Sequence, residues 1–175
     1  MEKHFTRQGL DLKQRQLKLQ EDKVKATGQE AGQEAGINCD WHDNFGYEDA
    51  KRRLELESSI LAALRDEVAG ARIISIEEQS ETVKIGVTVQ ILLGGDERSY
   101  TIGAFGESAP SSGLISYTSP LGRILFGMHP GDTKRAQLGG KNVEIELVRI
   151  YPPSYRYHDL IALLMASAAA SSQSR

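Results

Sequence analysis

The 175-residue sequence is poor in cysteine, aromatic residues and long apolar runs: it has one cysteine, Cys39, and 6% aromatic and 39% hydrophobic residues. A single cysteine excludes an internal disulfide. The low apolar content argues against one large core and favours a small domain with an elongated extension. The first four residues, Met-Glu-Lys-His, lack the apolar stretch of a secretory signal, so we expect a cytoplasmic protein.

The most apolar stretch, residues 160–166, is much shorter than the roughly 20 residues that cross a bilayer. We therefore expect no membrane partner; a packed tail helix and a helix that docks on a surface remain open. The net charge of -3 argues against broad binding of duplex nucleic acid, so any such contact should be local. The Ala/Ser-rich end, residues 167–175, predicts disorder.

Two thin apolar seams in the first 70 residues predict two long helices. In the first, apolar side chains recur every seven positions, and in the second, from Tyr47 to Val68, they follow three-and-four spacing that only Glu57 breaks. The seam residues are Leu10, Leu17, Val24 and Ala31, then Tyr47, Ala50, Leu54, Leu61, Leu64 and Val68. The short polar link between the seams favours an antiparallel coiled-coil hairpin, an arm that spans residues 1–70.

A repeated Gly-Gln-Glu-Ala sequence puts Gly28, Gly32 and Gly36 into the first of these helices. Each interior glycine costs a helix about 1 kcal/mol relative to alanine. Close approach of the second helix would explain the glycines, and so would a frayed helix end; the sequence leaves both open.

The second half of the chain has the alternating pattern of strands. Alternation from Val83 to Ile91 predicts a strand, Gly94-Gly95-Asp96 a turn, and Gly139-Gly140 a second hairpin. Between them, Ser119 and Pro120 begin a short predicted helix as capping residue and first helical residue. We expect an α+β domain over residues 71–151, an antiparallel sheet with one short helix, and then a tail, residues 152–175, with a short helix followed by disorder.

Asp40 and Asp43 stand three positions apart in the link between the predicted helices. On a helical turn this spacing puts the two Cβ atoms about 5–6 Å apart, so both carboxylates can reach one hard cation such as Mg²⁺. Capping or a solvated turn is the alternative for such a pair. Cys39 and His42 flank the pair, but a structural zinc site normally has four ligands, and the sequence offers no second cysteine.

The run from Gly113 to Asp132, GLISYTSPLGRILFGMHPGD, resembles the C-terminal domain of bacterial Gre transcript-cleavage factors. The similarity extends from Val83 through Ile150, and a helical hairpin followed by this domain is the order found in that family. The resemblance implies an FKBP-like fold for residues 71–151. It also implies that bacterial RNA polymerase is the partner, that the coiled coil enters its secondary channel, and that the protein is a monomer. Acidic residues at the tip would then stimulate the polymerase to cleave backtracked RNA, without catalysis by the chain alone.

The resemblance also implies roles for particular residues. The family's tip pattern is matched by Asp40, Asp43, Asn44 and Tyr47, although Asp43 stands where Glu is usual and Gly46 where an acid is usual. Asp40 and Asp43 would be the catalytic pair and would bind Mg²⁺ of the polymerase active site, with no cofactor held by the chain itself. The other implied sites are Asn44, Lys51 and Arg52 near the 3′ end of the nascent RNA, and Ser119, Pro120 and Arg123 for docking on the polymerase. Trp41 and Phe45 are bulkier than is usual in the family; stacking on an RNA base and packing of the turn are both open for them. A solvated helix face is the alternative for Lys51 and Arg52.

Several functions compete on this sequence. Asp43 is one methylene shorter than Glu, and a misplacement of about 1 Å can cost a catalytic group about a hundredfold in rate. A non-cleaving homologue that occupies the same channel and inhibits transcription is therefore the alternative to a cleavage factor. FKBP-like folds also host prolyl isomerases, for which an apolar pocket of Tyr100, Phe105, Tyr117 and Phe126 would be needed. A scaffold protein that binds through its arm and tail is the remaining hypothesis.

Overall fold

The computed structural model describes residues 3–37 and 45–173 and divides into two compact units. Met1–Lys3 and Leu10–Arg72 form the first, which we call the arm; His4–Gly9 and Ile73–Arg175 form the second, which we call the sheet domain. The chain passes from one unit to the other in two short paired strands, β1 (Lys3–Phe5) and β2 (Ala71–Ile73). The predicted order, a helical hairpin followed by an α+β domain, is confirmed.

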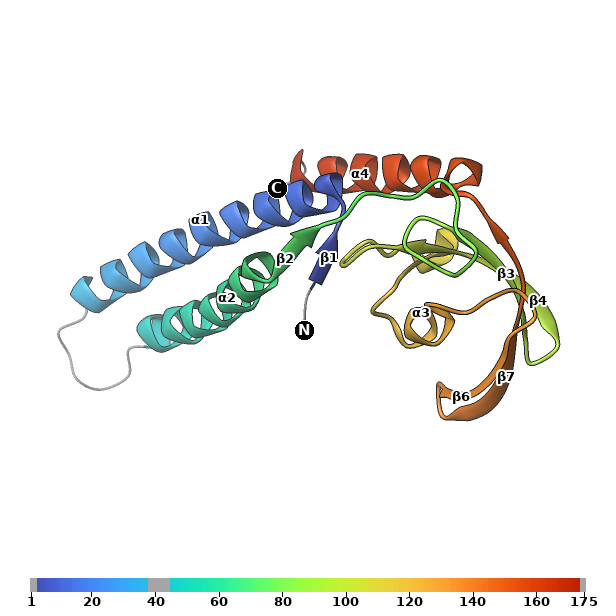
Figure 1. Cartoon of the computed structure of the whole chain (residues 1–175). Coiled ribbons are helices and arrows are strands. Elements are labelled where there is room, and N and C mark those ends of the chain that lie inside the picture. Colours follow the sequence, from blue (N-terminus) through green and yellow to red (C-terminus); the bar gives the residue numbers. More distant parts are fainter. Residues whose placement is uncertain (1–2, 38–44, 174–175) are drawn as a thin grey trace. The chain divides into compact units, whose positions relative to one another are not determined.

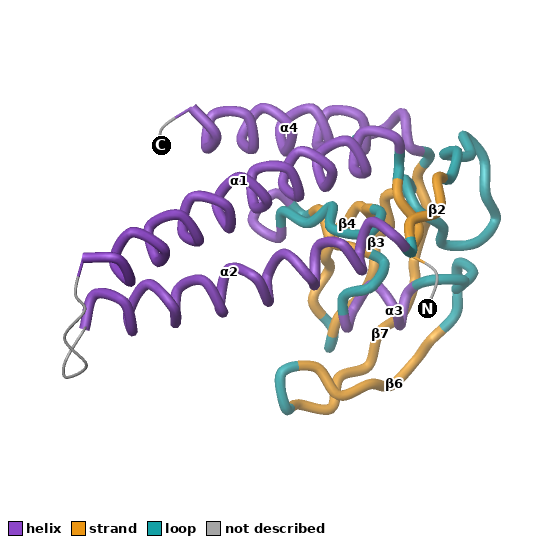
Figure 2. Tube along the Cα trace, turned by 90° about the vertical axis from the view of Figure 1, so that its left-hand side faces the viewer, coloured by secondary structure: helices purple, strands orange, loops and turns teal. Residues whose placement is uncertain are grey.

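The helices of the arm are α1 (Arg7–Ile37), whose first three residues belong to the sheet domain, and α2 (Phe45–Ala69). The two helices lie side by side in both views (Figures 1 and 2). Ion pairs fix their direction, because Lys13 near the start of α1 contacts Glu67 near the end of α2 at 2.8 Å. Glu30, late in α1, contacts Arg53, early in α2, at 2.9 Å. The two helices are therefore antiparallel, as the short link predicted.

The predicted seams are the buried line of the arm. Ala31, Ala50 and Leu61 are buried, and the remaining seam side chains are half-buried. Glu57, which broke the pattern, has a side chain only 14% exposed and bonds across to α1, with its carboxylate 2.7 Å from Lys23 Nζ and 2.6 Å from Gln20 Nε2. These hydrogen bonds, that of Lys23 first, hold the pKa of Glu57 below its ordinary value. Glu57 thus interrupts the apolar seam because its carboxylate forms polar contacts between the two helices.

Tight helix packing does not explain the first two glycines of the repeat, Gly28 and Gly32. A Cβ atom on Gly28 would lie 3.8 Å from Leu54 Cδ1, an ordinary contact. For Gly32, no atom among the described residues that lies outside its own helical turn would come within 4 Å of an added Cβ. At Gly32, then, an alanine would fit.

The sheet domain is built on five strands in the order β5-β4-β3-β7-β6, which form the curled sheet of Figure 1. Their bounds are β3 Thr88–Leu93, β4 Asp96–Gly103, β5 Leu114–Ser116, β6 Thr133–Leu138 and β7 Lys141–Tyr151. Both predicted hairpins are confirmed: Gly94-Gly95 joins β3 to β4, and Gly139-Gly140 joins β6 to β7. All four glycines have positive φ, between 57° and 95°, the left-handed conformation that tight hairpin turns require.

The sheet differs from the prediction in two places. First, β3 begins at Thr88 rather than at Val83, because Gly86 (φ 100°) turns the chain ahead of the strand. Val83 is nevertheless buried, and its N–H donates to the Met128 carbonyl at 2.9 Å, so alternation indicated burial but not strand pairing. Second, β5 pairs with β4 in parallel, so the sheet is mixed rather than antiparallel throughout.

The main core lies between one face of the sheet and α3 (Pro120–Leu125), which sits inside the curve of the sheet in Figure 1. Its buried members are mostly aliphatic: Val83, Val87, Val89, Ile91, Ile102, Ile115, Leu125, Met128, Ile145 and Leu147. Leu121 and Ile124 of α3 pack against them from the helix side. This packing fixes the helix that carries the predicted docking residues. The FKBP-like assignment stays an expectation of the resemblance.

The tail forms the 3-10 helix η2 (Pro153–Tyr155) and then α4 (Tyr157–Gln173), which is longer than the short helix that we predicted. Tyr157, Leu160 and Ile161 recur at helical spacing and pack on Leu114 of β5, forming a second, smaller buried cluster. Beyond them the sequence is rich in alanine, the strongest helix former, which extends the helix. Among the described residues, none of the helices combines the length and apolar character needed to cross a bilayer.

Candidate functional site

The acidic pair falls between the two helices of the arm. α1 ends at Ile37 and α2 begins at Phe45, so Asp40 and Asp43 belong to the connection between antiparallel helices, as predicted. Both aspartates lie outside the described residues, as do the neighbouring candidates Cys39, Trp41, His42 and Asn44. Their predicted roles therefore stay predictions, supported by the order of the helices on either side.

The described candidates near this connection are on the first turns of α2. Phe45 is the first residue of the helix and is 78% exposed, and Lys51 and Arg52 are exposed as well. Arg53 differs from them, because its guanidinium donates to both Glu30 oxygens, at 2.9 and 3.2 Å, and contacts Asp49 at 3.0 Å. The bond to Glu30, more than that to Asp49, raises the pKa of Arg53. Arg53 thus joins the two helices, while Lys51 and Arg52 present positive charge at the surface.

The ligand chemistry of the pair suits a shared magnesium ion. Within residues 3–37 and 45–173, no group of three or more His, Cys, Asp and Glu side chains is placed to hold a metal. Mg²⁺ prefers oxygen ligands and usually keeps several waters, so one or two carboxylates suffice where a second macromolecule supplies the rest. Asp40 and Asp43 supply two carboxylates, and their binding to such an ion stays a prediction. The zinc alternative at Cys39 and His42 is untested, because both residues lie outside the described part of the chain.

The Ser119-Pro120-Leu121-Gly122 motif builds the start of α3. Ser119 Oγ accepts the Gly122 N–H at 3.0 Å with the extended backbone of a capping residue, and Pro120 is the first helical residue. Gly122 is buried, and a Cβ atom there would lie 2.2 Å from the Ser116 carbonyl oxygen. Ser119 and Gly122 therefore have structural roles, whatever else the motif does.

The exposed side of α3 carries the other predicted docking residues. Pro120 and Arg123 are both exposed and, being three positions apart, lie on neighbouring parts of the helix surface. Phe126, just after the helix, is 39% exposed. Lys134 Nζ donates to the Ile124 carbonyl at 2.9 Å, so a cation also satisfies the end of the helix. The helix thus offers a rigid surface with a proline, an arginine and an aromatic side chain.

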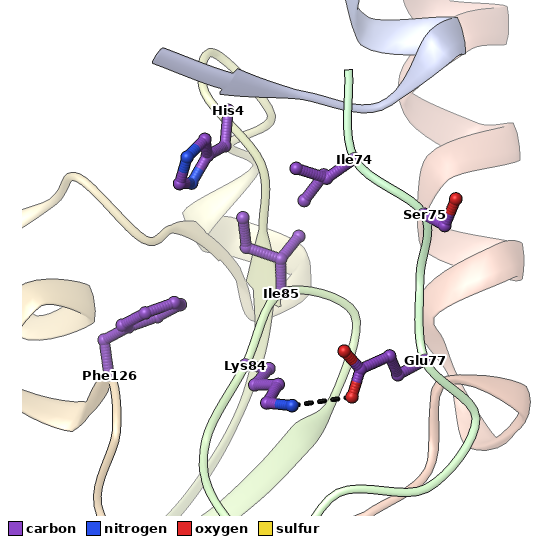
Figure 3. A pocket seen from close by; sticks show the side chains of 7 residues that line it. All are labelled: His4, Ile74, Ser75, Glu77, Lys84, Ile85 and Phe126. Carbon is purple, nitrogen blue, oxygen red and sulfur yellow. Dashed lines mark hydrogen bonds and ion pairs between the residues drawn. The ribbon is translucent and has the colours of Figure 1, made fainter. Parts of the chain in front are cut away.

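Next to Phe126 the sheet domain has a pocket of about 180 Å³ (Figure 3). It is lined by His4, Ile74, Ser75, Glu77, Lys84, Ile85 and Phe126, and the Lys84–Glu77 ion pair of 2.6 Å stands at one side. Sequence reasoning did not find this pocket, because its residues come from four separate segments and share no pattern.

The four aromatic residues proposed for a proline pocket do not surround one cavity. Tyr117 and Phe126 are neighbours, with ring centroids 5.8 Å apart, and of the four only Phe126 lines the pocket described above. Phe105 packs on Phe5 instead, at 5.2 Å, and Tyr100 packs against the main core. The geometry of the described residues gives the prolyl isomerase hypothesis no support.

Comparison with known proteins shows the family of this chain. Residues 78–152 match the family described as "Transcription elongation factor, GreA/GreB, C-term". The chain is 31% identical over 144 residues to transcription elongation factor GreA of Nitratiruptor sp., covering 81% of this chain and 87% of that protein. The chain belongs to the GreA/GreB family of transcription elongation factors. The predicted family resemblance is confirmed.

Other members and solved structures are also similar to this Gre-family chain. GreA of Christiangramia forsetii is 29% identical over 152 residues, covering 85% of this chain and 96% of that protein. The crystal structure of GreA factor homolog 1 of Thermus thermophilus is similar at 23% identity and a TM-score of 0.42, covering 86% and 99% of the two chains. A GreA/GreB elongation factor from Nitrosomonas europaea is similar at 25% identity and a TM-score of 0.37, covering 57% and 90%.

Proposed function

We propose that this chain binds bacterial RNA polymerase, places its arm in the secondary channel and stimulates cleavage of backtracked nascent RNA. The observation that carries the proposal is the similarity to GreA over 87% of that protein's length, in a chain whose arm bears Asp40 and Asp43 between two antiparallel helices. The reaction centre would belong to the polymerase, so the chain stimulates an activity rather than catalysing alone. We expect it to act as a monomer in the bacterial cytoplasm.

In this mechanism Asp40 and Asp43 would hold Mg²⁺ of the polymerase active site together with the polymerase's own ligands. The bound ion would supply Lewis-acid chemistry that favours hydrolysis of a phosphodiester. The chain's own contribution is to bring Asp40 and Asp43 to the ion in a fixed geometry. The bonds of Arg53 to Glu30 and of Lys23 and Gln20 to Glu57 support this role, because they hold the helices together behind the tip.

The exposed residues near the tip and on α3 would supply the remaining contacts. Lys51 and Arg52 present positive charge that suits the phosphates near the RNA 3′ end, and exposed Phe45 offers a ring on which a base can stack. Trp41 and Asn44 would lie near the same RNA end. Ser119, Pro120 and Arg123 would dock the sheet domain on the polymerase; Ser119 does so through the helix that it caps.

A non-cleaving factor that occupies the same channel is the second candidate. The observation that favours it is Asp43, whose side chain is one methylene shorter than the Glu usual in the family, together with Gly46 in place of an acid. A carboxylate about 1 Å short of its position can lose about a hundredfold in rate while the arm still blocks the channel. Such a factor would reduce RNA synthesis without producing shortened transcripts.

The deciding experiment adds the full chain to halted, backtracked polymerase complexes with Mg²⁺ and measures shortened RNA. A cleavage factor should raise the rate above the polymerase background, and Asp40→Ala with Asp43→Ala should return it to that background. The matched control is Asp22→Ala with Glu55→Ala, which removes two exposed carboxylates from the arm and should leave cleavage unchanged. If the wild-type chain inhibits RNA synthesis and only the Asp43→Glu variant stimulates cleavage, the second candidate is correct. If neither protein binds the polymerase or alters transcription, both candidate functions are wrong.

A further inference from the structure

The sheet domain contains a buried carboxylate, Glu107, which is 1% exposed and follows β4 in the chain. Three donors from three segments satisfy it. The Thr6 hydroxyl donates to Oε1, and Oε2 accepts the Ala104 N–H at 2.8 Å and the Tyr157 hydroxyl at 2.7 Å. Burying a carboxylate costs free energy unless hydrogen bonds replace those that it made to water. Loss of any one of the three donors therefore weakens the site that holds the other two.

On one side, Glu107 holds the N-terminal segment His4–Gly9. Thr6 Oγ1 accepts the Gly9 N–H at 3.0 Å, so the hydroxyl that donates to Glu107 also caps the start of α1. A Cβ atom on Gly9 would lie only 2.8 Å from Glu107 Oε1, so the first turn of α1 approaches the carboxylate as closely as a glycine allows. The order of this first turn therefore depends on Glu107.

On the other side, Glu107 is held by Tyr157, the first residue of α4. Tyr157 is 3% exposed, and its burial, reinforced by the charge of Glu107, raises the pKa of the phenol well above its ordinary value. The phenol therefore keeps its proton and donates across the physiological pH range. Glu107 thus bonds the beginning of the tail helix to the beginning of the arm helix.

We propose that α4 is a latch that holds the segment His4–Gly9 on the sheet domain through Glu107. The buried cluster under α4, which contains Leu114, Tyr157, Leu160 and Ile161, is separate from the main core. Small clusters of this kind open at lower free energy than the global fold. When α4 leaves its cluster, Glu107 loses the Tyr157 donor and becomes hydrated, and the Thr6 cap of α1 is weakened. One cooperative opening unit therefore contains α4, His4–Gly9 and Ala104–Glu107.

The latch uses parts of the chain on both sides of residues 78–152, which match the GreA/GreB family. Its consequence is that the first turn of the arm helix is ordered only while the tail helix is seated. A partner that removes α4 from its cluster would release the base of α1. The inference concerns contacts within the sheet domain and holds whether or not the chain promotes RNA cleavage.

Hydrogen exchange of the full chain, followed by mass spectrometry or NMR, tests the latch with a pair of matched variants. Tyr157→Phe removes the donor to Glu107, while Tyr155→Phe makes the same chemical change at a tyrosine that is 56% exposed. A hydrogen bond to a charged group is strong enough that its loss should speed exchange at the Gly9 and Ala104 amides about tenfold or more. Tyr155→Phe should change these amides less than twofold, and the amides of β3 and β7 should be unchanged in both variants.

The reverse perturbation must also work, because coupling between two sites is reciprocal. Gly9→Ala crowds Glu107 from the side of α1 and should speed exchange in the first turns of α4, although the two segments are far apart in the sequence. Faster exchange of α4 in Tyr157→Phe with no change at Gly9 would overturn the latch. An unchanged α4 in Gly9→Ala would do the same, even if Tyr157→Phe failed to fold.

Discussion

The same substitution, glycine to alanine, should have opposite effects on the two units of this protein. Gly122 lies in α3, and its added Cβ would stand 2.2 Å from the Ser116 carbonyl oxygen, 2.9 Å from Ser119 Oγ and 3.0 Å from Tyr117 Cα. Gly32 lies in α1, where no described atom beyond its own helical turn would come within 4 Å. Gly122→Ala must therefore displace α3, whereas Gly32→Ala only adds a helix-favouring residue.

The magnitudes follow from these distances. To accept the Cβ, α3 must move by about 1 Å against the sheet, and overpacking of this kind costs about 1–3 kcal/mol. The movement also strains the Ser119 cap, which is worth about 1 kcal/mol, so the sheet domain should lose about 2–4 kcal/mol. Replacing an exposed interior helix glycine by alanine should stabilise α1 by about 1 kcal/mol.

Urea unfolding followed by near-UV circular dichroism measures the sheet domain, because five of the six tyrosines lie in it. With a denaturant slope of about 1–3 kcal/mol per molar, Gly122→Ala should lower the midpoint by about 1 M or more. Hydrogen exchange measures the arm, where Gly32→Ala should slow the amides around residue 32 about fivefold. An unchanged urea midpoint in Gly122→Ala, or faster exchange in Gly32→Ala, would refute this account of the two glycines.

Two further predictions concern charge. Hydrogen bonds from Lys23 and Lys3 lower the pKa values of Glu57 and Asp66, respectively. These carboxylates therefore stabilise the arm at any pH above their ordinary pKa values of 4.5 and 3.8, and the stabilisation is lost as the pH falls below those values. Thermal unfolding of the arm by far-UV circular dichroism should therefore shift down between pH 7 and pH 3, and less so in Glu57→Gln; an equal shift in both proteins would contradict the assignment. Arg123→Ala should weaken binding to RNA polymerase about tenfold, measured by co-sedimentation titration, and should leave the urea midpoint unchanged. The control Arg98→Ala, at an exposed arginine of β4, should leave binding unchanged. Equal loss of binding in the two variants would place docking elsewhere.

Features that depend on neighbours in the sequence were predictable. The Gly94-Gly95 and Gly139-Gly140 turns require only a local left-handed backbone, and the start of α3 requires only a capping serine followed by proline. Helical spacing likewise predicted which side chains line the arm. In each case the physical cause acts between residues that are close in the sequence, so residue type and spacing are enough to predict the feature.

Features that depend on distant partners were not predictable. Val83 has the pattern of a strand residue but bonds to the chain after α3, and the parallel pairing of β5 with β4 depends on how the intervening loop returns. Glu107, in an ordinary Gly-Glu-Ser loop, gave no signal at all, because its two side-chain donors lie 101 residues before it and 50 residues after it. The candidate site at Asp40 and Asp43 came from the sequence alone.

The sequence by itself therefore determined the helical hairpin and the hairpin turns, because local backbone preference and side-chain periodicity specify them. It also contained the motifs that carry the family resemblance and the acidic pair Asp40 and Asp43. Only the tertiary structure decided which polar residues are structural. It showed that Glu57 bonds across the seam, that Arg53 joins the helices while Lys51 and Arg52 stay exposed, and that Tyr157 and Thr6 meet at Glu107. A buried charge acquires its role from the donors that folding brings to it, and those donors cannot be identified from the residues next to it in the chain.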